Sequence, residues 1–151
     1  GSFLQDVRST RQLPAPVRAL RRLKIKELQA RAADRSDPEE ADAAQRLLEN
    51  VFVFTSHYEP IRYLKRGDPA RALLLLQIAH AIKPDHPQVC YNRARAHAMN
   101  KQKRKAIRDL ACALRSGRLP AGLLEKDAYL KPLRQEKAFR ELMEGPSQTA
   151  R

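Results

Sequence analysis

Histidines are the first side chains to consider for chemistry in this sequence, because imidazole serves both as a metal ligand and as a general base. The chain has four of them, namely His57, His80, His86 and His97. No two of them stand at a helical ligand spacing with a third ligand nearby, as a zinc site would need. Ser56 precedes His57, but no acidic residue is evident that would orient this histidine. The sequence therefore predicts no catalytic, cofactor-binding or metal-binding residues, and we expect a protein that is not an enzyme.

The two cysteines, Cys90 and Cys112, stand at apolar positions inside expected helices. Free cysteine commonly behaves as a small buried hydrophobic residue. No Cys-x-x-Cys pair or Cys/His ligand spacing is present, which argues against a zinc site. We therefore interpret both cysteines as packing residues.

Two further patterns are explained without chemistry. Glu39 and Glu40 are adjacent carboxylates, but they fall at an expected helix start, where the helix dipole favours negative charge. Gly67 stands alone, without the further glycines of a phosphate-binding loop. Neither pattern predicts a catalytic site.

The chain is strongly basic, with a formal net charge of +13 and a pI near 10.3. The charge is uneven, since residues 57–116 carry 13 Lys and Arg against 4 Asp and Glu. Such a balance suggests an acidic partner, nucleic acid or an anionic surface, although it also serves solubility. No run of about 18 apolar residues is present, so we expect a soluble protein without a transmembrane segment, whose compartment the sequence does not assign.

Helices dominate the expected structure, because Ala, Leu, Arg and Lys are abundant while glycines and aromatic residues are few. A basic amphipathic helix is expected over about 16–33; its apolar stripe suits packing on a neighbouring helix better than a membrane surface or a calmodulin-like partner. A second helix is expected over about 38–53, capped by Asp37 or Ser36. Pro60 must then kink the helix or lie in the first turn of a new one, and we favour a new helix over 56–66.

A repeat organises the second half of the chain. The stretch from Tyr63 to Pro84 returns after a step of 34 residues, and each helix of the repeat is amphipathic. The matching positions pair Ala72 with Ala106, Leu76 with Leu110 and Ala79 with Ala113, whereas Gly67 falls on the mismatched Lys101.

We expect a tag remnant at 1–2, which indicates a trimmed part of a longer protein, and then an N-terminal helical extension at 3–52. Repeats follow at 53–86 and 87–120, a degenerate third repeat or capping helix at 121–145, and a disordered tail at 146–151.

These positions resemble the tetratricopeptide repeat family. The first unit carries Tyr63, Leu64, Gly67, Asp68, Ala72, Leu76, Ala79 and Pro84 at the signature places of the family, and Ala94, Ala106, Leu110 and Ala113 match in the second. The sequence departs from the pattern at Ser56, Glu59 and Pro60, and again at Arg93 and His97. The resemblance implies an all-α fold, namely a right-handed α-solenoid of two helix–turn–helix repeats with N-terminal helices and a C-terminal capping helix.

The resemblance also implies a concave groove lined by the first helix of each repeat, in which relatives bind peptides or protein segments. The positions that match this groove are His57, Ile61, Gln88, Tyr91, Asn92, Arg95 and Met99. Asn92 matches a place where many relatives hold a ligand backbone or carboxylate, and Arg95 suits an acidic ligand. His57 and Ile61 stand where a clamp for a free C-terminal carboxylate would need Lys and Asn, so that type of clamp is not expected.

A second candidate surface is a basic patch at the turn and second helix of the second repeat, formed by Lys101, Lys103, Arg104, Lys105 and Arg108. It lacks the interleaved aromatic residues that stack on bases, but it suits contact with phosphates. Our leading hypothesis is a non-catalytic scaffold or adaptor module that binds an acidic peptide or protein segment in the groove. The alternatives are binding of nucleic acid or another polyanion through the basic faces, and a regulatory appendage of an enzyme whose catalytic domain lies elsewhere.

Overall fold

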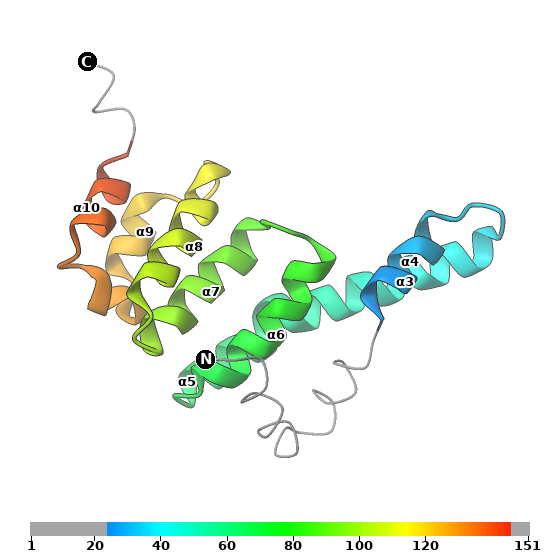
Figure 1. Cartoon of the computed structure of the whole chain (residues 1–151), viewed down its shortest axis with the longest axis horizontal. Coiled ribbons are helices and arrows are strands. Elements are labelled where there is room, and N and C mark those ends of the chain that lie inside the picture. Colours follow the sequence, from blue (N-terminus) through cyan, green and yellow to red (C-terminus); the bar gives the residue numbers. More distant parts are fainter. Residues whose placement is uncertain (1–23, 146–151) are drawn as a thin grey trace. The chain divides into compact units, whose positions relative to one another are not determined.

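The computed structural model describes residues 24–145, while residues 1–23 and 146–151 lie outside the described part (Figure 1). Every regular element between residues 24 and 145 is a helix, which confirms the all-α fold class. None of these helices has the length and apolar character that crossing a bilayer requires. The chain divides into two compact units, residues 1–52 and 53–151.

The first unit contains α3 (Ile25–Ala33) and nearly all of α4 (Pro38–Val53). The part of the expected basic helix that precedes residue 24 lies outside the described residues. Asp37 caps α4, because its carboxylate accepts a hydrogen bond from the backbone N–H of Glu40 at 3.2 Å, as predicted. In the connecting loop, hydrogen bonds from the Ser36 hydroxyl and then from its backbone N–H lower the pKa of Asp34.

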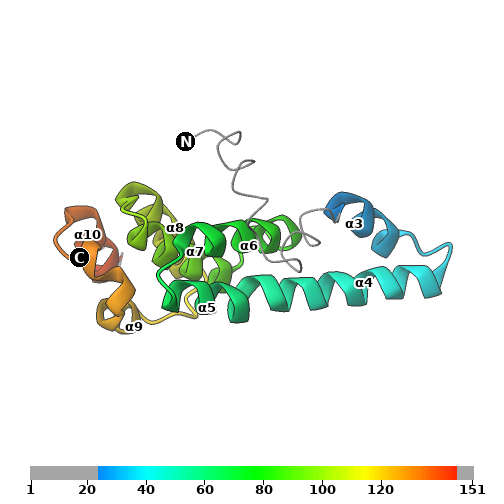
Figure 2. The same ribbon diagram turned by 90° about the horizontal axis from the view of Figure 1, so that it is seen from below.

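The second unit is a series of short helices joined by tight turns. In chain order these are the π-helix η2 (Phe54–Tyr58), α5 (Glu59–Lys65), α6 (Pro69–Ile82), α7 (Pro87–Met99), α8 (Lys103–Arg115), α9 (Ala121–Lys126), the 3-10 helix η3 (Ala128–Leu133) and α10 (Lys137–Glu144). From η2 to α8 each helix packs on the next, so that α7 contacts both α6 and α8, and η3 also packs on α7 (Figure 2). The core of this unit therefore lies around α7.

Pro60 lies in the first turn of α5, as we favoured, but this helix begins at Glu59 rather than near residue 56, and no break precedes it. The backbone stays helical from η2 into α5, with one turn of π-helix ahead of the proline. A proline inside a helix lacks the N–H that would bond the carbonyl four residues earlier, and its ring crowds that carbonyl. The wider π-turn accommodates this crowding around Ser56.

The repeated small and large positions are buried as the 34-residue step requires. Ala72, Leu76 and Ala79 on α6, together with Ala106, Leu110 and Ala113 on α8, are all 0 % exposed. Alanine at such positions lets the helix backbones approach closely, while leucine fills the space beside them. The second helices also start in step, since α6 begins at Pro69, α8 at Lys103 and α10 at Lys137.

The turns at Gly67 and Lys101 have the same backbone shape despite their different residues. Gly67 has a φ of 74° and Lys101 a φ of 59°, so both lie in the left-handed region. The N–H of Asp68 bonds the carbonyl of Tyr63 at 2.9 Å, and the equivalent bond from Gln102 to His97 is 2.8 Å. The sequence mismatch at Lys101 is therefore not a structural mismatch.

Candidate partner-binding surfaces

Asn92, the predicted ligand-holding residue, is fully buried and makes a bond within the protein. It is 0 % exposed, and its Nδ2 donates a hydrogen bond to the backbone carbonyl of Ser56 at 2.8 Å. This is the carbonyl that cannot pair with residue 60, because Pro60 has no N–H. Asn92 thus supplies the donor that the proline removes and joins α7 to η2, so its side chain is not available to a partner in this conformation.

Tyr91 and Arg95, the next two predicted groove residues on α7, both bind Asp127, which precedes η3. The Tyr91 hydroxyl donates to the Asp127 carboxylate, and the Arg95 Nε donates to it at 2.6 Å. The same carboxylate caps η3 by accepting from the N–H of Tyr129 at 2.8 Å. The acidic partner that the sequence suggests for Arg95 is therefore supplied by the chain itself.

The aromatic rings around Arg95 complete this cluster. Its guanidinium lies 4.2 Å from the ring centroid of Tyr91 and 5.5 Å from that of Tyr129, within the range of cation–π attraction. Burial, and then the hydrogen bond to Asp127, raise the pKa of Tyr91 to about 12. The phenol therefore stays protonated and keeps donating across the physiological pH range.

The other predicted groove residues remain accessible. His57 is exposed, whereas Ile61, Gln88 and Met99 are half-buried. Tyr58 was not among the predicted residues, yet it is 64 % exposed, and its ring lies edge-on to that of His57 at 5.1 Å. Sequence reasoning missed it because the groove positions were counted on an α-helix, while these two residues lie on the π-turn of η2.

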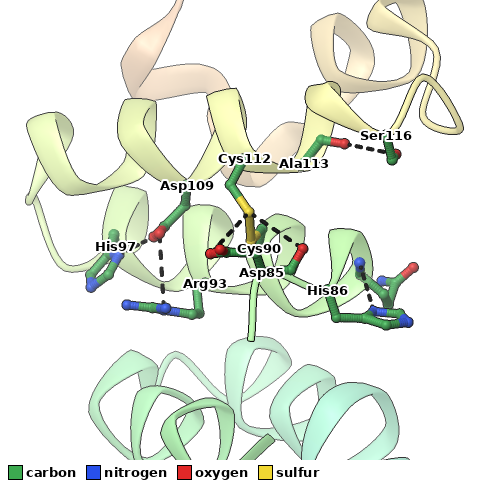
Figure 3. Close-up of a disulfide and its surroundings, with 10 residues drawn as sticks. Asp85, His86, Cys90, Arg93, His97, Asp109, Cys112, Ala113 and Ser116 are labelled. Carbon is green, nitrogen blue, oxygen red and sulfur yellow. Dashed lines mark hydrogen bonds and ion pairs between the residues drawn. A yellow bond between two sulfur atoms is a disulfide. The ribbon is translucent and has the colours of Figure 1, made fainter. Parts of the chain in front are cut away.

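Cys90 and Cys112 form a disulfide between α7 and α8, which corrects their interpretation as unlinked packing residues (Figure 3). Both are buried, as predicted, but the covalent bond was not foreseen. The available signal was that each cysteine occupies one helix of the same predicted pair. Asp85 lies beside them, with donor atoms of all three residues within 4.8 Å of one another. The disulfide occupies both sulfur atoms, so in this state the group does not offer three metal ligands.

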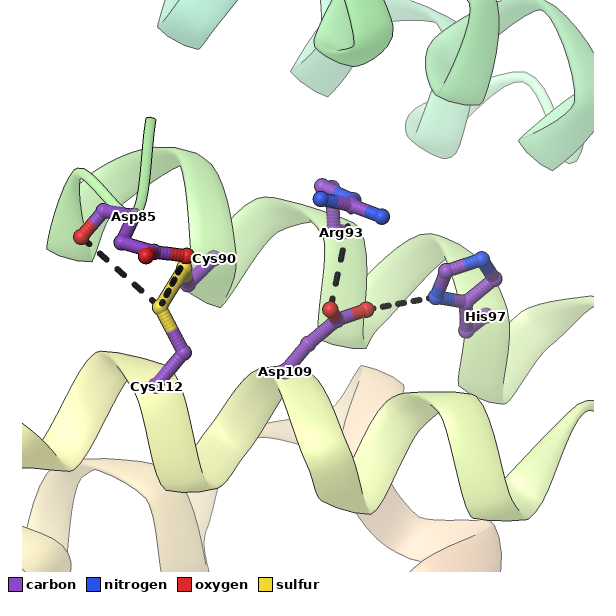
Figure 4. A network of polar contacts seen from close by, with 6 residues as sticks. All are labelled: Asp85, Cys90, Arg93, His97, Asp109 and Cys112. Carbon is purple, nitrogen blue, oxygen red and sulfur yellow. Dashed lines mark hydrogen bonds and ion pairs between the residues drawn. A yellow bond between two sulfur atoms is a disulfide. The ribbon is translucent and has the colours of Figure 1, made fainter. Parts of the chain in front are cut away.

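A buried polar cluster lies beside the disulfide between the same two helices (Figure 4). The His97 Nδ1 is 2.6 Å from the Asp109 carboxylate, and the Arg93 Nε is 3.9 Å from its other oxygen. A carboxylate can orient a histidine for proton transfer, but here the third member is an arginine rather than a nucleophile. The cluster compensates buried charge, and it gives Arg93 and His97, two departures from the family pattern, a common polar partner.

The predicted basic patch is the most accessible of the sequence-derived surfaces. All its members, Lys101, Lys103, Arg104, Lys105 and Arg108, are exposed. Lys103 forms an ion pair of 3.1 Å with Glu136. The one acidic residue within α8 is Asp109, which is buried and bound to His97. The exposed face of α8 is therefore purely cationic in its charged side chains.

Comparison with known proteins returned no match: no protein family, no curated protein and no solved structure shows significant similarity to this chain.

Proposed function

We propose that this chain is a non-catalytic interaction module that binds an acidic protein segment, built as a right-handed two-repeat α-solenoid with a capping helix. The common start of α6 and α8 in the 34-residue step supports this arrangement, as do their fully buried Ala–Leu–Ala positions. The function rests on one observation, which is the exposed positive face of α8 and its preceding turn.

The structure favours this cationic face over the concave groove as the main contact surface. In the groove, Asn92 is buried and Arg95 is already paired with Asp127. On α8, Lys103 is paired with Glu136, but Arg104, Lys105 and Arg108 are exposed, and an incoming carboxylate can pair with these three groups. His57, Ile61, Gln88 and Met99 remain as a second surface that a longer segment could reach.

A polyanion such as RNA is the second candidate, and one observation favours it. Lys65 and Arg66 at the α5–α6 turn are exposed, and so are Lys101 and Lys103 at the equivalent α7–α8 turn. Basic groups at successive turns suit the regular phosphates of a nucleic acid backbone.

Fluorescence anisotropy with two labelled probes separates these functions. One probe is a peptide rich in Glu and Leu, and the other is a single-stranded RNA of mixed sequence. We expect the peptide to remain bound at 200 mM salt, whereas RNA held by five phosphate contacts would lose about 100-fold in affinity between 50 and 200 mM salt. Tighter binding of the RNA at both salt concentrations would replace the proposed function with the polyanion alternative.

A charge-reversed variant locates the surface. Lys101, Lys103, Arg104 and Lys105 are changed to Glu, and the matched control changes the exposed Lys24, Lys26, Arg31 and Arg46 of the first unit to Glu. Both variants have the same net charge. Equal losses of peptide binding would show that total charge, rather than the α8 face, governs the interaction.

A further inference from the structure

A groove lies between α8 and α10, next to the cationic face of α8. Its volume is about 590 Å³. Arg108, Ala111, Leu114 and Arg115 of α8 line one side, and Glu141, Leu142 and Gly145 line the other. The two helices contact each other.

The α8 side of this groove has an ordered chemical pattern. Arg108 and Arg115 are seven residues apart, which is two helical turns or about 10 Å. Both are exposed, and the positions between them that line the groove are the apolar Ala111 and Leu114. The groove thus presents a positive charge, an apolar floor and a second positive charge along one line.

One acidic side chain, Glu141, faces the same groove from α10. Its carboxylate lies 3.7 Å from the Nζ of Lys137 on the same helix. An exposed pair of this kind offsets only part of the negative charge. Glu141 therefore disfavours phosphate or another dense anion close to α10, while it leaves the α8 side attractive to carboxylates.

We propose that this groove binds an amphipathic acidic helix of a partner protein, with carboxylates at positions i and i+7 and large apolar side chains at i+3 and i+4. On such a helix the two carboxylates have the same two-turn separation as Arg108 and Arg115. The apolar side chains between them would cover Ala111, Leu114 and Leu142, as in other helix-in-groove complexes. The inference rests on the proposed function and specifies both its partner and its surface.

The probe for the test is a synthetic helical peptide with Glu at i and i+7 and Leu at i+3 and i+4, measured by fluorescence anisotropy against the whole chain. A second peptide of equal composition has the second Glu at i+5, which is on another face of the helix. We expect the first peptide to bind about tenfold more tightly, which is the effect of one well-placed ion pair. Equal affinities of the two peptides would contradict the proposal that the groove binds this helix.

Variants at exposed positions test the protein side without touching the core. Arg108→Glu together with Arg115→Glu should weaken binding of the first peptide by about tenfold for each arginine, and Glu141→Gln should strengthen it. The matched control reverses Arg118 and Arg140, which are exposed and do not line the groove. Circular dichroism checks that each variant keeps its helical content.

The outcomes separate the two proposals. One outcome would support the proposed function but contradict the groove. In it, peptide binding is lost in the variant at Lys101, Lys103, Arg104 and Lys105 and is kept in the variant at Arg108 and Arg115. If neither acidic peptide binds, both proposals fall. Conversion of a dimer to a monomer by the Arg108 and Arg115 changes, seen by sedimentation, would assign the groove to a second copy of the chain and overturn the partner helix.

Discussion

The helix pair α5–α6 and the helix pair α7–α8 have matching turns but different interior chemistry. Tyr63 and Leu75 of the first pair are buried and uncharged, while His97 and Asp109 stand at the equivalent places of the second pair and bind each other. Three residues further along, Ile78 of the first pair corresponds to Cys112, which is bonded to Cys90.

This difference teaches that one backbone arrangement can be stabilised in two ways. Apolar burial is non-directional and tolerates substitution by residues of similar volume. A buried ion pair gives little net stability relative to an apolar pair, but removing one partner leaves the other without compensation. A single change at His97 or Asp109 in the second pair should therefore cost more stability than a single change in the first pair. Replacing both residues by an apolar pair need not lower the stability.

Among the changes that test this comparison, reduction of the disulfide should lower the free energy of unfolding the most. Cys90 and Cys112 are 22 residues apart, and the chain-entropy model gives about 3 kcal/mol of stabilisation for a loop of this length. Urea unfolding with and without a dithiol reductant measures it. The Cys90→Ser, Cys112→Ser double variant should lose a similar free energy of unfolding and should no longer respond to reductant. An unchanged midpoint for the reduced wild-type chain would mean that the bond is not formed in solution.

Changing Asp109 tests the polar cluster. Asp109→Leu, the residue of the first pair, should lower the free energy of unfolding by about 2–3 kcal/mol, because His97 and Arg93 lose their buried partner. Adding His97→Tyr, the residue of the first pair, should recover part of this loss, while Arg93 still lacks the carboxylate of Asp109. Chemical denaturation of the wild type, both single variants and the double variant gives the coupling energy. Strictly additive effects would contradict the expected dependence of the two residues on each other.

Asn92 joins the second pair to η2, which leads into the first pair, and its removal should cost about 1–2 kcal/mol. Asn92→Ala deprives the Ser56 carbonyl of its donor in a buried site. Pro60→Ala restores an N–H at the position from which an α-helix would bond this carbonyl. The cost of Asn92→Ala, measured by urea unfolding, should therefore be smaller in the Pro60→Ala background. If Asn92→Ala costs the same free energy of unfolding in both backgrounds, Asn92 does not compensate for the N–H that Pro60 lacks.

The turns should give the smallest effects, in opposite directions. Gly67→Ala introduces a Cβ that meets nothing within 4 Å, so its cost of about 1 kcal/mol comes from the left-handed φ alone. Lys101→Gly relieves the same strain, while the freedom that glycine gains in the unfolded state offsets about half of that benefit. The net stabilisation should be about 0.5 kcal/mol. Thermal unfolding measures both shifts. Destabilisation by Lys101→Gly would show that the lysine side chain contributes more than its backbone strain costs.

The helical class and the buried positions could be predicted because they depend on periodicity. Ala72, Leu76 and Ala79 repeat at Ala106, Leu110 and Ala113, and apolar positions at helical spacing must find a buried face. The Asp37 cap was also predictable, because an N-cap bond is made within four residues of sequence. These features are local or strictly repeated.

The fate of the groove residues could not be predicted, because it depends on contacts distant in the sequence. Asn92 meets Ser56, and Arg95 meets Asp127, in each case more than 30 residues away. A polar side chain on a helix looks the same in sequence whether it faces solvent or a distant carbonyl. Lys101 shows the converse limit, since a residue unsuited to a left-handed turn adopts it where the neighbouring helices require it.

The attachment of Asp127 to Arg95 also sets a threshold for competing ligands. Because the carboxylate belongs to the same chain, it acts at a high effective concentration, in the millimolar range or above for short connections. A free carboxylate in dilute solution would rarely displace it. A ligand that is already bound elsewhere on the protein would also have a high effective concentration at Arg95, and so it could compete with Asp127. Arg95 would thus bind only a ligand that is already bound at another surface of the protein.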